Sequence, residues 1–272
     1  MEAVITQLDS LTRAKYFSGV ALVSIFYDHL LTLHSEISTI WANPNRDYFP
    51  KLTYVMNRYY TEAIVIYVAY VLSGTASLND SECRRFIWVF ALTATVFIGT
   101  TQFFILFRVY HSWDKRKHLV IILLAGFTAF ITASTTLAII TVADAQDHVQ
   151  YNPALRTCII FELPSILPYM LGSLLGFHLF LILLALYNAF ERPHRTHADI
   201  IDSLHSDGAR LFIVLLRLLT VIMSVVGSPA DCFGVLNIVW ALDSIITSRI
   251  HMRVEGLKFA SFGKTSRSFL AI

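Results

Sequence analysis

Charged residues are scarce in this chain. Asp, Glu, Lys and Arg make up 15% of its 272 residues, whereas a soluble protein carries roughly 25%. Two long stretches, 86–107 and 119–142, contain no charged residue at all. Each exceeds the roughly 20 residues that an α-helix needs to cross about 30 Å of hydrocarbon. The composition therefore argues against an ordinary soluble domain and predicts membrane-spanning helices.

Motifs for catalysis and cofactor binding are also missing. The sequence has no Gly-rich phosphate loop and no nucleophile elbow. The last apolar stretch, 232–248, has no Lys that could form a Schiff base with retinal. The histidines between 194 and 205 lack the i,i+4 pair of zinc enzymes. The net charge of +2 is too small to indicate nucleic acid. We therefore expect no enzyme activity, cofactor, metal site or nucleic-acid partner.

The apolar stretches predict an all-α integral membrane protein with a seven-helix bundle. A polar outer tail is expected at 1–15 and a cytosolic tail at 249–272, and six spans are the main alternative. The seven predicted spans are 16–33, 52–72, 86–107, 119–142, 163–190, 209–227 and 232–248.

The loop between the two uncharged stretches sets the predicted orientation. It contains Arg108, Lys115, Arg116 and Lys117, and short loops rich in Lys and Arg stay on the cytosolic side. Most other loop cations then fall on the same side, which places the N-terminus outside and the C-terminus in the cytosol. We expect a plasma-membrane or endomembrane protein whose cytosolic partner, if any, binds Lys115, Arg116, Lys117 and the 191–208 loop.

Five charged residues lie within the predicted spans, where each is costly unless it is paired or faces a wet cavity. Similar depths in the membrane suggest one ion pair between Asp28 and Arg58 and another between Arg217 and Asp243. Glu62 lies four residues after Arg58 and is a second candidate partner. These residues are candidates for a ligand cavity or polar network, and equally for structural pairs that fix helix register.

Three cysteines, Cys83, Cys158 and Cys232, all fall on the predicted outer side, where a disulfide is allowed. A Cys83–Cys158 bridge would tie the third span to the following outer loop, but the sequence cannot choose the pair. Asn79 begins an Asn-Asp-Ser glycosylation sequon on the same side.

A family resemblance covers residues 24–60. Tyr27-Asp28, Leu30-Leu31-Thr32-Leu33, Glu36-Ile37, Ile40-Trp41 and Arg58-Tyr59 resemble the N-terminal signature of a large fungal family of multipass membrane proteins. That family is defined by a domain of unknown function, so the resemblance implies a seven-helix membrane architecture without an activity.

The leading functional hypothesis is receptor-like signal reception through an outer cavity between the second, third, fifth, sixth and seventh spans. A small-solute or proton-coupled carrier is the first alternative, and a structural or scaffold membrane protein is the second.

Overall fold

A computed structural model describes residues 2–42, 48–76, 78–112, 117–153, 156–191 and 197–269. These residues are mostly helical, and they form seven α-helices, two short helical segments and one β-hairpin. The elements in chain order are α1 (Glu2–Glu36), η1 (Ile37–Trp41), α2 (Tyr48–Ser73), α3 (Asp80–Ser112), α4 (Lys117–Ala145), η2 (Gln146–His148), β1 (Val149–Asn152), β2 (Thr157–Ile160), α5 (Leu167–Glu191), α6 (His197–Val226) and α7 (Pro229–Phe269).

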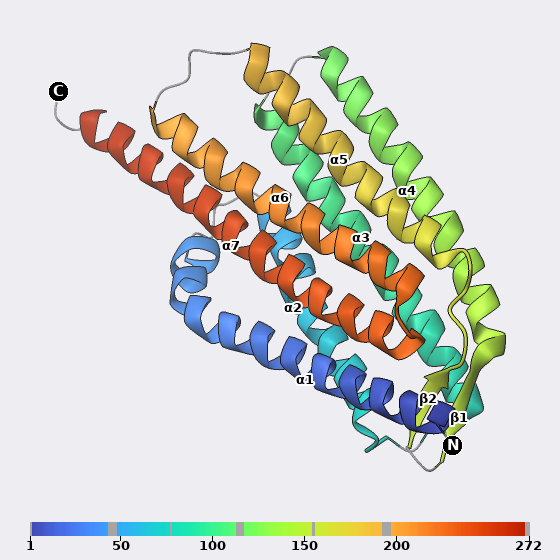
Figure 1. The fold of residues 1–272 in the computed structure, drawn as a ribbon. Coiled ribbons are helices and arrows are strands. Elements are labelled where there is room, and N and C mark those ends of the chain that lie inside the picture. The colour runs from blue at the N-terminus through green and yellow to red at the C-terminus, as the bar shows by residue number, and fades with distance from the viewer. Residues whose placement is uncertain are drawn as a thin grey trace.

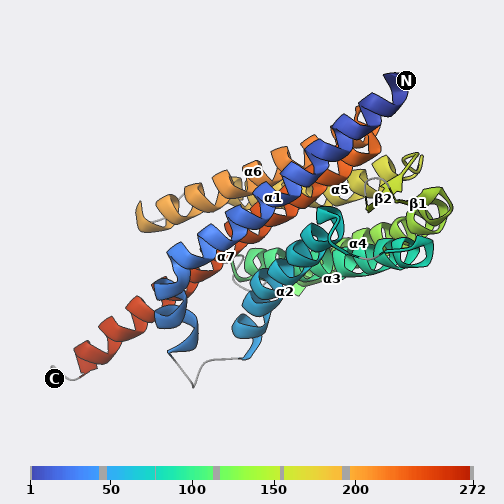
Figure 2. The same cartoon turned by 90° about the horizontal axis from the view of Figure 1, so that it is seen from below.

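The helices lie side by side in an elongated bundle (Figures 1 and 2). α1 runs along α7, and α2 contacts both of them as well as α3. On the other side α3, α4, α5 and α6 follow one another as neighbours, and α6 closes the arrangement by contacting α7. α1 begins at the end of the bundle that carries the hairpin, and α7 ends at the opposite end.

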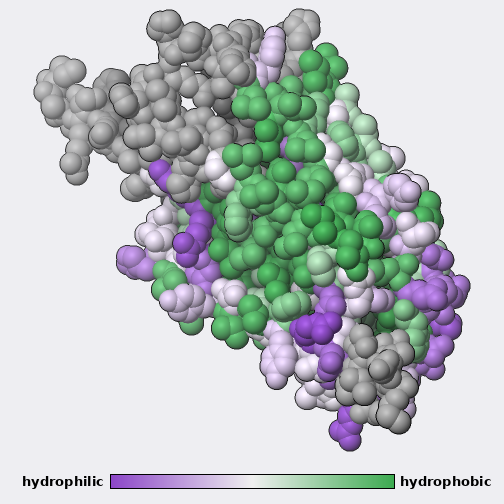
Figure 3. Space-filling view, in the orientation of Figure 1, coloured by the Kyte–Doolittle hydropathy of each residue, from purple (hydrophilic) through white to green (hydrophobic). Residues whose placement is uncertain are grey.

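Five of the described helical segments are long and apolar enough to cross a membrane, namely Asp9–Trp41, Asp80–Leu106, Val120–His148, Leu167–Leu184 and Pro229–Gly256. The prediction of a mostly helical chain with several membrane-compatible helices is thereby confirmed. α2, which carries Arg58 and Glu62, is not in this set, and the apolar part of α6 is shorter, Leu211–Val226. Large apolar side chains are exposed on many helices, and Figure 3 shows them gathered over the middle of one face, with hydrophilic residues mostly around its margin.

Two segments expected to be tails are helical. Residues 2–15 of the expected outer tail form the start of α1, and residues 249–269 of the expected cytosolic tail continue α7. In α1 the reason lies in tertiary contacts, because Leu11 and Ala14 are buried and Arg13 forms an ion pair with Asp231 at the start of α7, with 2.8 Å between Nη2 and Oδ2. The polar composition of these two segments therefore did not indicate where α1 begins or where α7 ends.

The expected polar loop 143–162 also contains regular structure. After η2, strands β1 and β2 pair antiparallel with Val149 opposite Ile160. Val149, Thr157 and Cys158 are buried, and the backbone N–H of Tyr151 donates to Asp80 Oδ1 at 2.8 Å. The hairpin thus closes over one end of the bundle.

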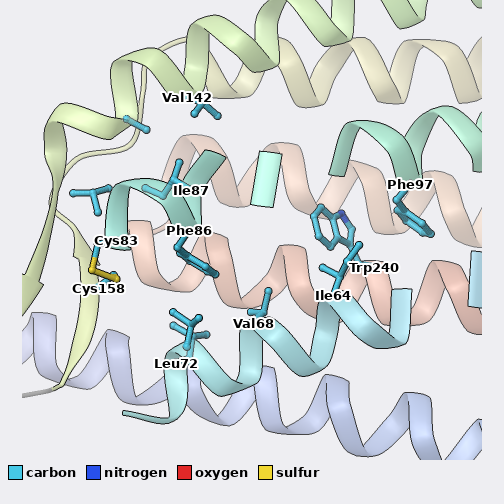
Figure 4. Packing of buried hydrophobic residues seen from close by; sticks show 13 residues of the cluster. Ile64, Val68, Leu72, Cys83, Phe86, Ile87, Phe97, Val142, Cys158 and Trp240 are labelled. Carbon is cyan, nitrogen blue, oxygen red and sulfur yellow. A yellow bond between two sulfur atoms is a disulfide. The ribbon is translucent and has the colours of Figure 1, made fainter. Parts of the chain in front are cut away.

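The main apolar cluster lies beneath this hairpin and joins α2, α3, α4 and α7. Phe86 and Leu72 lie near the hairpin, while Phe97 and Trp240 lie deeper in the bundle (Figure 4). The indole of Trp240 stacks on Phe90, with 4.7 Å between ring centroids. This packing holds α3 and α7 together along the centre of the molecule.

Gly234 permits a close approach of α7 to α1. A Cβ atom at this position would lie 2.8 Å from Phe17 Cδ2 and 3.2 Å from Ala14 Cα. Small residues at such crossings let helix backbones come together, which matters most where no hydrophobic effect drives association. The start of α7 is therefore held against α1, near Ala14 and Phe17, at a distance that only glycine allows.

We expect Gly234→Ala to destabilise the protein by about 1–3 kcal/mol, the usual range for overpacking. The matched control is Gly19→Ala in α1, where an added Cβ meets no atom within 4 Å. Alanine at an open helical position should be neutral or slightly stabilising. Thermal unfolding in detergent measures both, and an equal response of the two variants would contradict the close packing.

Candidate functional site

Two lines of polar residues face each other across α1 and α2. On α1, Asp28, Thr32 and Glu36 are spaced four apart. On α2, Arg58 and Glu62 follow the same spacing. Residues four apart lie on one face of a helix, so each line forms a stripe, and the fold turns both stripes inward. Arg58, Asp28, Glu36 and Glu62 are all buried, and we call these four residues the carboxylate network.

Arg58 is the centre of this network. Its Nη2 lies 3.3 Å from Asp28 Oδ2, and its Nε lies 3.7 Å from both Glu36 Oε2 and Glu62 Oε1. Nη2 also donates to Thr32 Oγ1 at 2.7 Å. The predicted proximity of Arg58 to Asp28 and Glu62 is therefore present, and Glu36 is a third carboxylate that the charge argument did not include. One guanidinium faces three carboxylates, so it is the group that makes their burial tolerable.

Further hydrogen bonds fix the carboxylates. Glu36 accepts from the hydroxyls of Tyr54, at 2.8 Å, and Tyr59, and from the indole Nε1 of Trp41 in η1 at 2.8 Å. The π-helical turn of η1 follows directly after Glu36 and brings Trp41 back to it. His29 Nδ1 lies 2.6 Å from Glu62 Oε1. Each carboxylate thus has hydrogen-bond partners as well as charge partners.

α7 joins the network at two heights. Arg249 Nε donates to Asp28 Oδ1 at 2.7 Å. Nearer the middle of the bundle, Asn57 Nδ2 donates to Ser248 Oγ at 3.0 Å and to the carbonyl of Ser244 at 3.1 Å, while the Ser244 hydroxyl donates to the carbonyl of Asn57 at 2.7 Å. α1, α2 and α7 are therefore held together by polar contacts over several turns.

A second buried ion pair lies beside Ser244. Arg217 of α6 donates through Nη2 to Asp243 Oδ2 of α7, as the depth argument predicted. Their side chains are 3% and 1% exposed. Arg217 Nε and Nη1 have no hydrogen-bond partner within the part of the chain that the structure describes. This pair therefore retains hydrogen-bond donors that are neither solvated nor satisfied.

Arg217 also reaches the wall of an apolar cavity of about 130 Å³. The cavity is lined mainly by α3, α4, α5 and α7, and Ile160 of the hairpin and Pro229 at the start of α7 also contribute to its wall. The expected cavity between the second, third, fifth, sixth and seventh spans is thus placed differently. α4 contributes to the wall and α2 does not, because α2 packs its polar face against α1 and α7.

The cysteines and the sequon lie at the hairpin end. Cys83 in α3 and Cys158 in β2 form a disulfide with 5.5 Å between their Cα atoms, and they are 75 residues apart in sequence. Cys232 is a free, buried cysteine. Asn79 is exposed and its Oδ1 accepts from the backbone N–H of Glu82 at 2.9 Å, which caps the start of α3. Glycosylation of Asn79 stays a prediction.

The predicted cytosolic partner site falls where the structure gives no side-chain description. Lys115 and Arg116 lie outside the described residues, as do 192–196 of the 191–208 loop. Lys117 begins α4, and residues 197–207 belong to α6, but their side chains are likewise outside the description. Within the described residues, no group of three or more His, Cys, Asp or Glu is arranged to hold a metal ion.

Sequence reasoning missed several members of the site, among them His29, Thr32, Glu36, Tyr54 and Arg249. The four-residue spacing along α1 and α2 was the signal that could have found most of them. Arg249 carried no such signal, because it was assigned to a polar tail rather than to a continuing helix.

The fold and these sites define a helical protein with membrane-compatible helices and buried ion pairs. Residues 16–61 match the model of a family of unknown function, DUF6533. The match covers α1 from Tyr16 and the first half of α2, and thus includes Asp28, Glu36 and Arg58 of the carboxylate network. No curated protein and no solved structure matches the chain significantly.

Proposed function

We propose that this chain is a multipass integral membrane protein with seven spans, an outer N-terminus and a cytosolic C-terminus. Burial of the charges supports spans at α2 and α6, because Arg58, Glu62 and Arg217 are turned into the bundle and paired. The outward surface of α6 then consists of Leu211, Leu215 and similar residues, which suit lipid. A plasma-membrane or endomembrane location and a fungal origin stay predictions.

Cysteine labelling in intact cells tests this orientation. With the hairpin end outside, a membrane-impermeant maleimide should label Thr75→Cys in intact cells, because this position between α2 and α3 is exposed. Cys83 and Cys158 are buried and joined in a disulfide. Cys232 is buried and provides the background. Labelling that needs permeabilised cells would reverse the topology.

We further propose that the protein receives a signal, as receptors do, and that its outer cavity binds the stimulus. The observation that carries this proposal is a line of polar contacts, joined at two points by neighbouring residues of the chain, that leads from the cavity wall to Arg249, halfway along α7. It runs from Arg217 to Asp243, then from the adjacent Ser244 to Asn57, and from the adjacent Arg58 through Asp28 to Arg249. α7 carries three of these residues, so a change at the cavity would be transmitted along one helix.

Distance measurements between spin labels test the coupling. Labels at Tyr48→Cys and Leu211→Cys, both exposed, report the position of the middle of α6 relative to the start of α2, which lies at the end of the bundle away from the hairpin. Replacing the pair by Arg217→Met/Asp243→Leu should shift the mean distance by about 2 Å or more in nanodiscs, the scale of helix shifts in switching proteins.

The matched control for this measurement is Arg85→Met/Glu82→Leu, which removes an exposed ion pair near the start of α3. Its distance distribution should equal that of the wild type. An unchanged distribution after removal of the Arg217–Asp243 pair would reject the proposal of reception.

A proton-coupled carrier is the second candidate, because His29 and Glu62 are two titratable groups in direct contact inside the bundle. A carrier predicts proton flux in proteoliposomes that Glu62→Gln abolishes. Reception predicts no such flux. Absence of both coupling and flux would leave a structural or scaffold role. None of these alternatives includes a catalytic step.

A further inference from the structure

The cavity and the Arg217 guanidinium together define a kind of ligand. Along its length the cavity is lined by apolar side chains, including Phe90 and Ala94 of α3, Leu171 of α5 and Leu236 of α7. Arg217 is the one charged residue among the lining residues that the structure describes. The lining also includes Thr95, Ser134, Thr135 and Thr141, and the hydroxyls of Thr95, Ser134 and Thr141 already have hydrogen-bond partners within the described chain. A site with apolar walls and a single charged group selects a mostly apolar molecule with one polar atom.

The position of Arg217 fixes where that polar atom lies. Ile160 of the hairpin and Pro229 contribute to the wall of the cavity, and Arg217 lies nine residues before the end of α6 at Val226. At 1.5 Å per residue the backbone of Arg217 is about 13 Å from that end of α6. A bound molecule would therefore place its polar atom deep in the bundle and its apolar part along α3, α4 and α5.

The net charge of the Arg217–Asp243 pair determines which polar group of a ligand can bind there. The Arg217 guanidinium is already neutralised by Asp243, so a carboxylate ligand would bring a net negative charge into a site shielded from water, which is costly. A carbonyl or hydroxyl oxygen adds no charge and accepts hydrogen bonds. Nε and Nη1 of Arg217 are buried donors without a partner in the described part of the chain, and they belong to a residue that lines the cavity, so a ligand oxygen that approaches the guanidinium would satisfy them.

The volume of the cavity limits the size of the ligand. A protein cavity of about 150 Å³ is known to hold benzene, and the present cavity is about 130 Å³. We propose that the cavity binds small neutral ligands of roughly six to ten non-hydrogen atoms, each with an apolar chain or ring and one ketone, aldehyde, ester or hydroxyl oxygen that Arg217 binds. This inference rests on the outer-cavity part of the proposed function and names the class of stimulus.

Photochemical labelling of the purified protein in nanodiscs tests the proposal. The probe is 2-heptanone with a diazirine on its chain, and labelled residues are located by mass spectrometry. We expect adducts on cavity residues such as Leu171 and Leu236, and competition by 2-octanone. Nonane, which has the same size but no oxygen, and octanoate, which is charged, should each compete at least about tenfold less well, since a hydrogen bond to a charged group is worth that factor or more.

Two variants and one control complete the test. Ala94→Leu fills the cavity, and Arg217→Met/Asp243→Leu removes the donors together with their counter-ion; both should reduce labelling of the cavity by about tenfold or more. Ala133→Leu makes the same change as Ala94→Leu on the exposed face of α4 and should leave labelling unchanged.

Each alternative outcome overturns a defined part of the proposal. Adducts confined to lipid-facing residues exclude the cavity as a binding site. Equal competition by nonane excludes the role of Arg217, and stronger competition by octanoate excludes a neutral ligand. The labelling experiment measures binding independently of the spin-label distances. If the probe labels the cavity but the double variant leaves the spin-label distances unchanged, only the proposal of reception is rejected. If the distances change but the probe does not label the cavity, only this ligand class is rejected.

Discussion

Arg58→Met is expected to lower the free energy of unfolding by about 3–5 kcal/mol, the usual cost of leaving buried charge without its partner. Arg58 is 2% exposed and lies within 4 Å of Asp28, Glu36 and Glu62. Methionine fills a similar space but provides no charge and no donor. The three carboxylates would then repel one another, with Arg249 as the remaining cation and His29 as a hydrogen-bond partner among the described contacts.

Two controls separate charge from geometry at this position. Arg58→Lys retains the charge but not the planar group that reaches several acceptors, so an intermediate loss is expected. Arg85→Met removes an exposed pair with Glu82 and should cost no more than about 1 kcal/mol. Unfolding in detergent, followed by circular dichroism, measures all three. If Arg58→Met and Arg85→Met lost the same stability, Arg58 would not hold the network together.

The second large effect concerns the pair at the cavity. Arg217→Met alone leaves Asp243 buried without its cationic partner. Asp243→Leu alone leaves Arg217 buried without its anionic partner. Each single change should cost about 3–5 kcal/mol, whereas the double variant Arg217→Met/Asp243→Leu should be nearly neutral or even stabilising, because no buried charge remains.

A double-mutant cycle checks this expectation with the four proteins measured under the same conditions. Because the double variant is expected to be nearly neutral, the coupling free energy should be close to the sum of the two single costs, about 6–10 kcal/mol. Additive losses would mean that the two side chains do not depend on each other. The result also matters for function, since a stable double variant is what the spin-label and photolabelling experiments require.

One physical property of buried ion pairs links the stability of these two networks to their proposed role in signalling. A buried ion pair contributes little net stability compared with apolar residues of the same volume, yet it is costly to break on one side. Such pairs strongly favour one helix arrangement over others. A ligand that hydrogen-bonds to Arg217 changes the balance at Asp243, and α7 connects this aspartate to Ser244, Ser248 and Arg249.

Some properties of this protein follow from the sequence by itself. Uninterrupted apolar stretches such as 119–142 require helices, because a backbone in hydrocarbon must satisfy its own hydrogen bonds. The cost of charge in apolar surroundings also made Asp28, Arg58, Arg217 and Asp243 conspicuous. Helical periodicity and approximate depth were enough to suggest which of them are neighbours, since both depend only on position along a helix.

Other properties were decided by tertiary structure alone. Whether a polar segment such as 1–15 or 249–269 ends a helix or continues it depends on the partner helix, here α1 against α7 with Gly234 between them. The choice of Cys83 and Cys158 over Cys232 required the hairpin of β1 and β2, whose pairing joins residues far from α3 in sequence. The cavity arose from the way α3, α4, α5 and α7 pack. Local sequence does not encode such spaces, because their shape depends on side chains from several helices at once.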